Sequence, residues 1–186
     1  MTERDILVVD CETDGLRRGR LAWEIAMTRI TADGEKNPRE FFIDVDLRDA
    51  EPMALAVGRF YDRSPMGLFL SGKTTVPKTN MTDFLTPRDA AATVARWTHG
   101  CQLVAANPTF DIPILEQLLY GYGLVPGWHY QVRDIESLTE GHLRRPVGGL
   151  KKCAEALDIP VDESREHTAA GDVAVAVAIW EKVMTP

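Results

Sequence analysis

The sequence predicts one α/β domain over residues 1–186, built on a mixed β-sheet whose first three strands are antiparallel and whose later strands are parallel. Three observations predict this fold class. Apolar, β-branched runs joined by short turn signals come first, which is typical of an antiparallel meander. Helical patterns are then interleaved with strand-like runs, which favours parallel strands flanked by helices. The length of 186 residues also fits one domain with a full hydrophobic core.

The composition is that of an ordinary globular protein, with 45% apolar and 26% charged residues. The net charge of −7 argues against a protein that coats long nucleic acid through a broad basic face, although a few phosphates could be held locally. No apolar run is long enough to span a membrane, and the charged N-terminus lacks a signal-peptide core. The three cysteines lack metal-type spacing, so we expect Cys11 and Cys101 to be buried free thiols in a cytoplasmic protein.

The first strand is predicted to end in a pair of acids. Residues Ile6 to Val9 form an apolar, β-branched run that leads directly into Asp10 and Glu12. Side chains two residues apart lie on the same face of a strand, about 7 Å apart. Two like charges held together are unfavourable unless a cation lies between them, and a divalent metal with hard oxygen ligands meets that need. Residues 13–16 then turn the chain at the carboxyl edge of the sheet, where open α/β folds place ligands.

The remaining elements are predicted in chain order. Further strands are predicted over residues 21–30, with Glu24 interrupting the run, and over 41–45, 101–106 and 128–133. Helices are predicted over residues 52–60, 87–99, 112–120, 135–143, 150–157 and 169–183. Thr86 and Asp134 are suitable N-caps, and the last helix is apolar on nearly every side, so we expect it to be buried. Residues 71–80 indicate a loop, and no role is predicted for residues 48–85.

Two more acids and one histidine stand out after the first strand. Asp111 follows a strand and opens a helix, and Asp172 lies five residues after His167. Five residues on a helix differ by roughly 140° in direction, so both side chains reach one centre only if His167 precedes the helix. Thr168 is a suitable N-cap, which puts His167 in the loop and Asp172 in the first turns. A carboxylate on an otherwise apolar helix needs a partner.

Taken together, these residues resemble the DnaQ-like (DEDDh) 3′→5′ exonucleases, a family that includes proofreading exonucleases, RNase T and oligoribonuclease. The first family motif, an apolar strand ending in D-x-E-T, matches residues 9–13. The second, N-x-x-F-D after a strand, matches residues 107–111, and the third, H-x-x-x-x-D, matches residues 167–172. Order, spacing and local context agree over residues 5–183. The family fold is RNase H-like, and the resemblance implies that fold here.

The resemblance implies an enzyme that hydrolyses the terminal phosphodiester of single-stranded DNA or RNA from the 3′ end and releases nucleoside 5′-monophosphates. It implies that two divalent ions, Mg²⁺ or Mn²⁺, are bound by Asp10, Glu12, Asp111 and Asp172. Such ions lie about 3.5–4 Å apart and stabilise both the attacking and the leaving oxygen. His167 would act as general base toward the attacking water, because an imidazole with a reference pKa of about 6.5 suits that role near neutral pH.

The same resemblance points to the residues that would hold the substrate. In the family, the turn after the first acids contacts the terminal nucleotide through backbone groups and an apolar wedge, which implicates Thr13, Gly15 and Leu16. Asn107 and Phe110 are further candidate substrate-binding residues. Phe110 could stack on a base, but packing beneath the second acid is the favoured reading of its position.

The main alternative is a non-catalytic member of the same fold that binds nucleic acid or associates with a polymerase. All five acidic and histidine positions are present, which argues against a silent member. A haloacid-dehalogenase-like phosphatase fits less well, because the order Thr13, Asp14, Gly15 does not match its pattern, and a nucleotidyltransferase would need a Gly-Ser helix before the acids. A homodimer, a polymerase partner and the choice between DNA and RNA all stay open.

Overall fold

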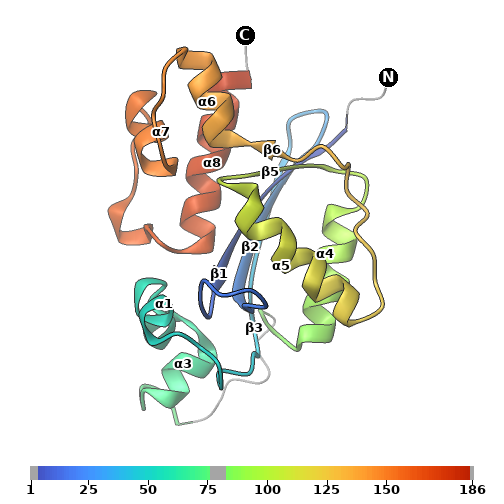
Figure 1. Cartoon of the computed structure of the whole chain (residues 1–186), viewed down its shortest axis with the longest axis vertical. Helices are drawn as coiled ribbons and strands as arrows, with labels where there is room; N and C mark the ends of the chain where they lie inside the picture. The colour runs from blue at the N-terminus through green and yellow to red at the C-terminus, as the bar shows by residue number, and fades with distance from the viewer. Residues whose placement is uncertain (1–3, 76–82, 185–186) are drawn as a thin grey trace.

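The structure, a computed structural model, describes residues 4–75 and 83–184 (Figure 1). It is organised around a six-stranded sheet with the strand order β4-β3-β2-β1-β5-β6. The strands are β1 (Ile6–Thr13), β2 (Ala22–Ile30), β3 (Lys36–Ile43), β4 (Phe84–Leu85), β5 (Gln102–Ala105) and β6 (Arg133–Asp134). The helices are α1 (Pro52–Val57), α2 (Phe60–Arg63), α3 (Pro65–Leu70), α4 (Pro87–Thr98), α5 (Pro108–Gly121), α6 (Ile135–Leu143), α7 (Leu150–Ala156) and α8 (Ala169–Met184), and a 3-10 turn, η1 (Glu163–Arg165), precedes α8.

The sheet is mixed, as the sequence predicts. β1 pairs antiparallel with β2, and β2 pairs antiparallel with β3. On the other side of β1, β5 runs parallel to it and β6 runs parallel to β5. The short β4 adds a parallel pair at the opposite edge. β1 is therefore a central strand with a neighbour on each side, which explains its continuous apolar run.

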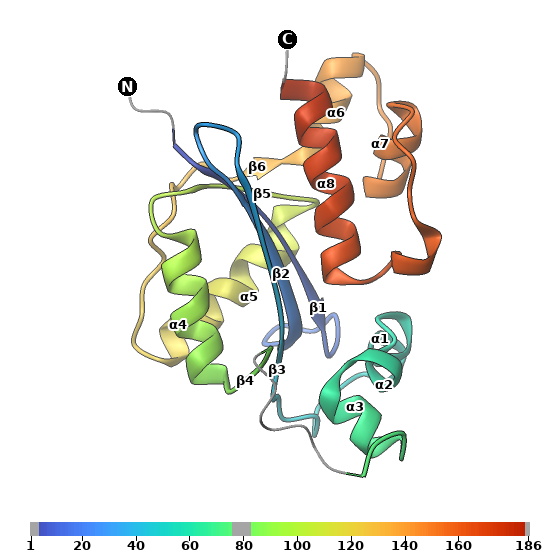
Figure 2. The same cartoon turned by 180° about the vertical axis from the view of Figure 1, so that it is seen from behind.

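Two helical layers cover the two faces of the sheet, and the side chains of β1 alternate between them (Figures 1 and 2). Leu7 and Val9 belong to the core that includes α4 and α5. Val8 belongs to the core that includes α6, α7 and α8. Asp10 and Glu12 continue the row of Val8, so they lie on the α8 side of the sheet, at the end of the strand.

Helices α1, α2 and α3 form a helical insert at the end of the sheet where β1 finishes, beside the N-terminus of α8 (Figures 1 and 2). Trp23 of β2 is fully buried and anchors the insert. Its ring meets Phe60 edge-on, with centroids 5.2 Å apart, and stacks on Phe42 at 6.3 Å. Its indole N–H donates to the carbonyl oxygen of Thr13 at 3.0 Å. The insert is thereby fastened to the strands that carry the first acids.

Several predicted helix starts are confirmed, and their caps explain them. α4 begins after Thr86, whose hydroxyl accepts a hydrogen bond from the backbone N–H of Asp89 at 3.2 Å. α6 begins after Asp134, whose carboxylate accepts from the backbone N–H of Glu136 at 3.1 Å.

The three cysteines are free and buried, as expected for Cys11 and Cys101. Within the described ranges, no helix has both the length and the apolar character that crossing a bilayer requires.

Other predicted elements are wrong in their bounds. The helix predicted over 52–60 ends at Val57 in α1, because the left-handed backbone of Arg59 interrupts the run, and two further short helices, α2 and α3, follow it. The strand predicted over 128–133 is wrong for most of its length, since only Arg133 lies in a strand. Its apolar side chains pack on the core from irregular backbone instead.

Two strands and one helix also extend beyond what the pattern predicts. β3 begins at Lys36, five residues before the predicted start, because its first half is an edge with polar, half-exposed side chains. β4 has only two residues, too few to give a periodic signal. α5 begins at Pro108 rather than at residue 112, since a proline fits the first turn of a helix. Of the predicted loop over 71–80, residues 76–80 lie outside the described residues.

Candidate active site

Three acids from two elements converge at the carboxyl end of β1. Asp10 and Glu12 come from β1, and Asp172 comes from the first turn of α8. One carboxylate oxygen from each lies within 4.8 Å of the other two, so the three could hold one metal ion. The sequence pattern brings them together because residues two apart on β1 share a face, and α8 packs its N-terminal end over that face. Hard carboxylate oxygens at this spacing suit Mg²⁺ or Mn²⁺.

Asp111 approaches the same place from the other helical layer. It lies in the first turn of α5 and is only 2% exposed. Its Oδ1 is buried and has no hydrogen-bond partner among the described residues. A buried carboxylate oxygen without a partner is costly, and a bound cation would satisfy it. Asp111 lies outside the group of three, but its negative charge raises the pKa of Asp10.

Burial makes each of these acids harder to ionise, and the neighbouring site acids add to this effect at Asp10 and Glu12. Burial raises the pKa of Asp10 well above its usual range, and the carboxylates of Asp111 and Asp172 raise it further. Burial is also the main reason that the pKa rises to about 7 for Glu12, to about 7 for Asp111 and to about 6 for Asp172. Like charges that raise one another's pKa mark a place where a cation is strongly favoured.

These raised pKa values predict an unusual pH dependence of stability in the absence of metal. Glu12, Asp111 and Asp172 have raised pKa values in the folded protein, so the folded state binds more protons than the unfolded state. Their contribution to stability is complete below about pH 4 and is lost as the pH rises through about 7. We therefore expect the Tm measured in EDTA to be lower at pH 8 than at pH 5, by on the order of 5 °C.

Differential scanning fluorimetry across this pH range checks the prediction. Saturating Mn²⁺ at pH 8 is expected to recover most of the lost Tm, because the ion replaces the protons. An Asp172→Asn variant serves as the matched comparison and is expected to show a weaker pH dependence in EDTA. A Tm that rises from pH 5 to pH 8 in EDTA would contradict the electrostatic account.

His167 lies in the loop between η1 and α8, as the sequence predicts, and its imidazole is exposed. Thr168 caps α8: its hydroxyl accepts from the backbone N–H of Gly171 at 3.0 Å and donates to the carbonyl of Arg165 at 2.7 Å. The backbone of His167 hydrogen-bonds the Asp172 carboxylate, and its side-chain charge lowers the pKa of that acid. The loop thus holds His167 next to Asp172 but outside the group that could hold the ion.

The turn after β1 is fixed by two acids. Asp14 is fully buried and pairs with the guanidinium of Arg17 at 2.7 Å. Glu51, just before α1, accepts hydrogen bonds from the backbone N–H groups of Leu16 at 3.1 Å and Arg17 at 3.3 Å. A Cβ atom added at Gly15 would lie 2.6 Å from the Glu51 carboxylate and 2.7 Å from the Arg17 guanidinium, so these two side chains would have to shift to accept it. Leu16 is left 73% exposed.

The other candidate substrate-binding residues have different environments. Thr13 is buried and its hydroxyl donates to the carbonyl of Gly15 at 2.9 Å, so it shapes the turn. Asn107 is exposed, with a left-handed backbone at the start of α5. Phe110 has one ring face covered by the guanidinium of Arg20, 3.8 Å from the ring centroid. This contact favours the packing role for Phe110, and the predicted substrate contacts of these residues stay predictions.

One buried ion pair was not predicted from the sequence. Glu24 of β2 is fully buried and its carboxylate receives both terminal nitrogens of Arg63 from α2. Burial raises the pKa of Glu24, and the Arg63 charge opposes that rise. Arg63 also donates to the carbonyl of Gly58 at 3.2 Å, so this one side chain joins the turn between α1 and α2 to Glu24 of β2. An acid inside an apolar strand is a signal of a buried partner, but nothing in the sequence indicates which of the arginines that partner is.

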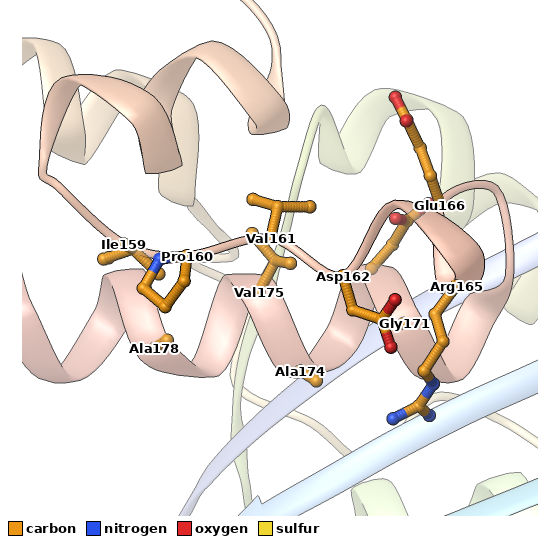
Figure 3. A pocket seen from close by; sticks show the side chains of 11 residues that line it. Ile159, Pro160, Val161, Asp162, Arg165, Glu166, Gly171, Ala174, Val175 and Ala178 are labelled. Carbon is orange, nitrogen blue, oxygen red and sulfur yellow. The ribbon is translucent and has the colours of Figure 1, made fainter.

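A small cavity beside α8 has Asp172 among its lining residues (Figure 3). It has a volume of about 150 Å³ and lies between residues 159–162 and α8. Its walls are mainly apolar, and Arg165 and Glu166 border one end, pointing to opposite sides. Ligand sites usually exceed about 300 Å³, so this cavity is too small for a nucleotide.

Comparison with known proteins supports the fold. No family model matches the chain, and no curated protein matches its sequence. Among solved structures, the chain is similar to E. coli Exonuclease I in complex with a dA16 oligonucleotide, with a TM-score of 0.71 and 17% identity. It is also similar to E. coli Exonuclease I in complex with a 5cy-dA13 oligonucleotide, with a TM-score of 0.67 and 18% identity. Each match covers 98% of this chain and 41% of the other, so the chain spans less than half the length of that exonuclease. The predicted RNase H-like fold is thereby confirmed.

Proposed function

We propose that the chain is a metal-dependent 3′→5′ exonuclease that hydrolyses the terminal phosphodiester of single-stranded DNA or RNA and releases nucleoside 5′-monophosphates. The observation that carries this proposal is the group formed by Asp10, Glu12 and Asp172, with oxygens within 4.8 Å of one another. The buried, unpartnered oxygen of Asp111 beside it supports a second ion. The fold shared with an exonuclease solved on DNA oligonucleotides supports single-stranded DNA as the first substrate to test.

The residues present fit two divalent ions, because the donors are all carboxylates and their mutual repulsion needs positive charge. When bound, such ions stabilise the attacking and leaving oxygens of a phosphodiester. Asp10, Glu12, Asp111 and Asp172 would hold them. His167, exposed at the rim and adjacent to Asp172, would accept the proton of the attacking water. The exposed Leu16 would pack on the terminal base, which orients the last phosphodiester.

The first test is metal-dependent shortening of a labelled strand. DNA and RNA oligonucleotides of the same sequence, labelled at the 5′ end, are incubated with Mg²⁺, Mn²⁺ or excess EDTA. We expect a ladder that shortens from the 3′ end in the presence of either metal, and no cleavage in EDTA, because the acids alone repel a phosphate. The same strands with a blocked 3′ end are the matched control and are expected to stay intact.

Two results would contradict the proposal. Full activity in EDTA would exclude the two-metal mechanism, and internal cleavage of the 3′-blocked strand would exclude an exonuclease. Binding of the strand with no cleavage under any metal would instead favour the non-catalytic alternative. The comparison of matched DNA and RNA strands also decides the sugar preference, which depends on contacts with the 2′ position.

A further inference from the structure

The helical insert forms one wall of the candidate active site through Gly58 and Arg59. A Cβ atom added at Gly58 would lie 2.9 Å from the Glu12 carboxylate and 2.7 Å from the Trp23 ring. The backbone of Gly58 therefore touches both a predicted metal ligand and the anchor of the insert. The next residue, Arg59, has a left-handed backbone with φ +55°. That conformation costs a residue with a side chain about 1 kcal/mol or more.

Arg59 reaches from the insert to η1, the turn that precedes the loop carrying His167. Its Nη2 donates to the carbonyl of Ser164 in η1 at 2.9 Å. Its Nε is buried and has no hydrogen-bond partner among the described residues. The charge of Arg59 also lowers the pKa of Glu12, which is consistent with a guanidinium close to the acids. Arg59 thus lies between the insert and the catalytic loop, beside the proposed ions.

The two arginines of the insert differ in how their charge is satisfied. Arg63 is paired with the Glu24 carboxylate through both terminal nitrogens. Arg59, within residues 4–75 and 83–184, has a hydrogen bond only to the neutral carbonyl of Ser164. The nearby Asp62 is already paired with Lys73. A guanidinium carries five donors in a planar fork, so most donors of Arg59 are free for an incoming anion.

We propose that Arg59 is a substrate-binding residue that donates to a non-bridging phosphate oxygen of the nucleic-acid strand next to the ions. This inference rests on the proposed exonuclease function and identifies Arg59 as the positively charged side chain that holds the phosphate there. The planar fork matches phosphate geometry. The hydrogen bond to Ser164 orients the side chain before substrate arrives.

Salt dependence of kcat/KM separates a phosphate contact from a structural role. Each phosphate contact on a single strand contributes about 0.7 to the slope of log affinity against log salt. With Mg²⁺ fixed and KCl varied, we expect Arg59→Met to lower kcat/KM on a single strand by on the order of 10- to 100-fold, mainly through KM. We expect its salt slope to fall by about 0.7, and Arg59→Lys to retain the slope. The control is Arg96→Met on α4, an exposed arginine in the opposite layer.

The outcomes distinguish this inference from the proposed function. An unchanged salt slope in Arg59→Met, with wild-type cleavage intact, would overturn the role of Arg59 and leave the exonuclease assignment standing. A lower Tm with the slope unchanged would likewise assign Arg59 to structure alone. Wild-type protein that neither cleaves nor binds the strand would overturn both. An equal loss of slope in Arg96→Met would also overturn the inference, because the effect would then reflect overall charge.

Discussion

Replacing Asp10 with asparagine is expected to abolish hydrolysis, with kcat falling by at least about 10³-fold, while the protein stays folded. Burial raises the pKa of Asp10, and the charges of Asp111 and Asp172 raise it further. An amide of the same size removes a metal-binding charge without creating a cavity. It also relieves repulsion, so the Tm measured in EDTA should be unchanged or higher than that of the wild type.

The separation of activity from stability makes this experiment informative. Cleavage of a 5′-labelled single strand gives the rate, and thermal unfolding in EDTA gives the stability of the same preparation. Glu155→Gln is the matched control, because it removes one carboxylate charge from an exposed position on α7. We expect that control to retain the wild-type rate. Normal cleavage by Asp10→Asn would show that this acid has no part in the reaction.

Replacing His167 is expected to lower kcat by about 10²- to 10³-fold with little change in KM or in stability. The backbone of His167 is left-handed, with φ +56°, and asparagine tolerates this conformation better than alanine does. His167→Asn therefore removes the base while it preserves the loop that positions Asp172. Because the imidazole is exposed and stands outside the group of acids, metal affinity should be nearly unchanged.

A purely structural role of His167 would leave the pH–rate profile unchanged when the residue is replaced, so this profile tests its role as the base. At saturating Mn²⁺, the wild-type rate should rise with pH as the base loses its proton, and this limb should disappear in His167→Asn. Manganese titration followed by Tm checks that ion binding persists in the variant. An identical profile in the variant and the wild type would remove His167 as the base.

Sequence periodicity predicted the centre of this molecule well. The alternation along β1 places Asp10 and Glu12 on one face, and an N-cap at Thr168 places Asp172 at the start of α8. Both signals are local, so they can be read without knowing the rest of the fold. The mixed sheet follows from the order of strands and helices and is confirmed by pairing and by structural similarity. The roles of these residues as metal ligands stay predictions.

The surroundings of the acids were not predictable in the same way. The contact between Glu24 and Arg63 joins residues 39 positions apart, and that between Arg59 and Ser164 joins residues 105 positions apart. Such pairings depend on tertiary packing and leave no periodic trace in the sequence. The strand predicted over residues 128–133 is wrong at residues 128–132 for a related reason. Apolar side chains of this segment pack on the core from irregular backbone, and an apolar pattern alone cannot distinguish such a segment from a strand.

The position of Asp111 links catalysis to the integrity of the whole fold. This acid comes from the α5 layer, whereas Asp172 comes from the α8 layer on the opposite face of the sheet. An ion held by both would join the two helical layers at the end of β1. A partly unfolded form that had lost either layer would therefore have a much lower affinity for the ion. Manganese should therefore protect slowly exchanging amides in both layers together, and not only those near the acids.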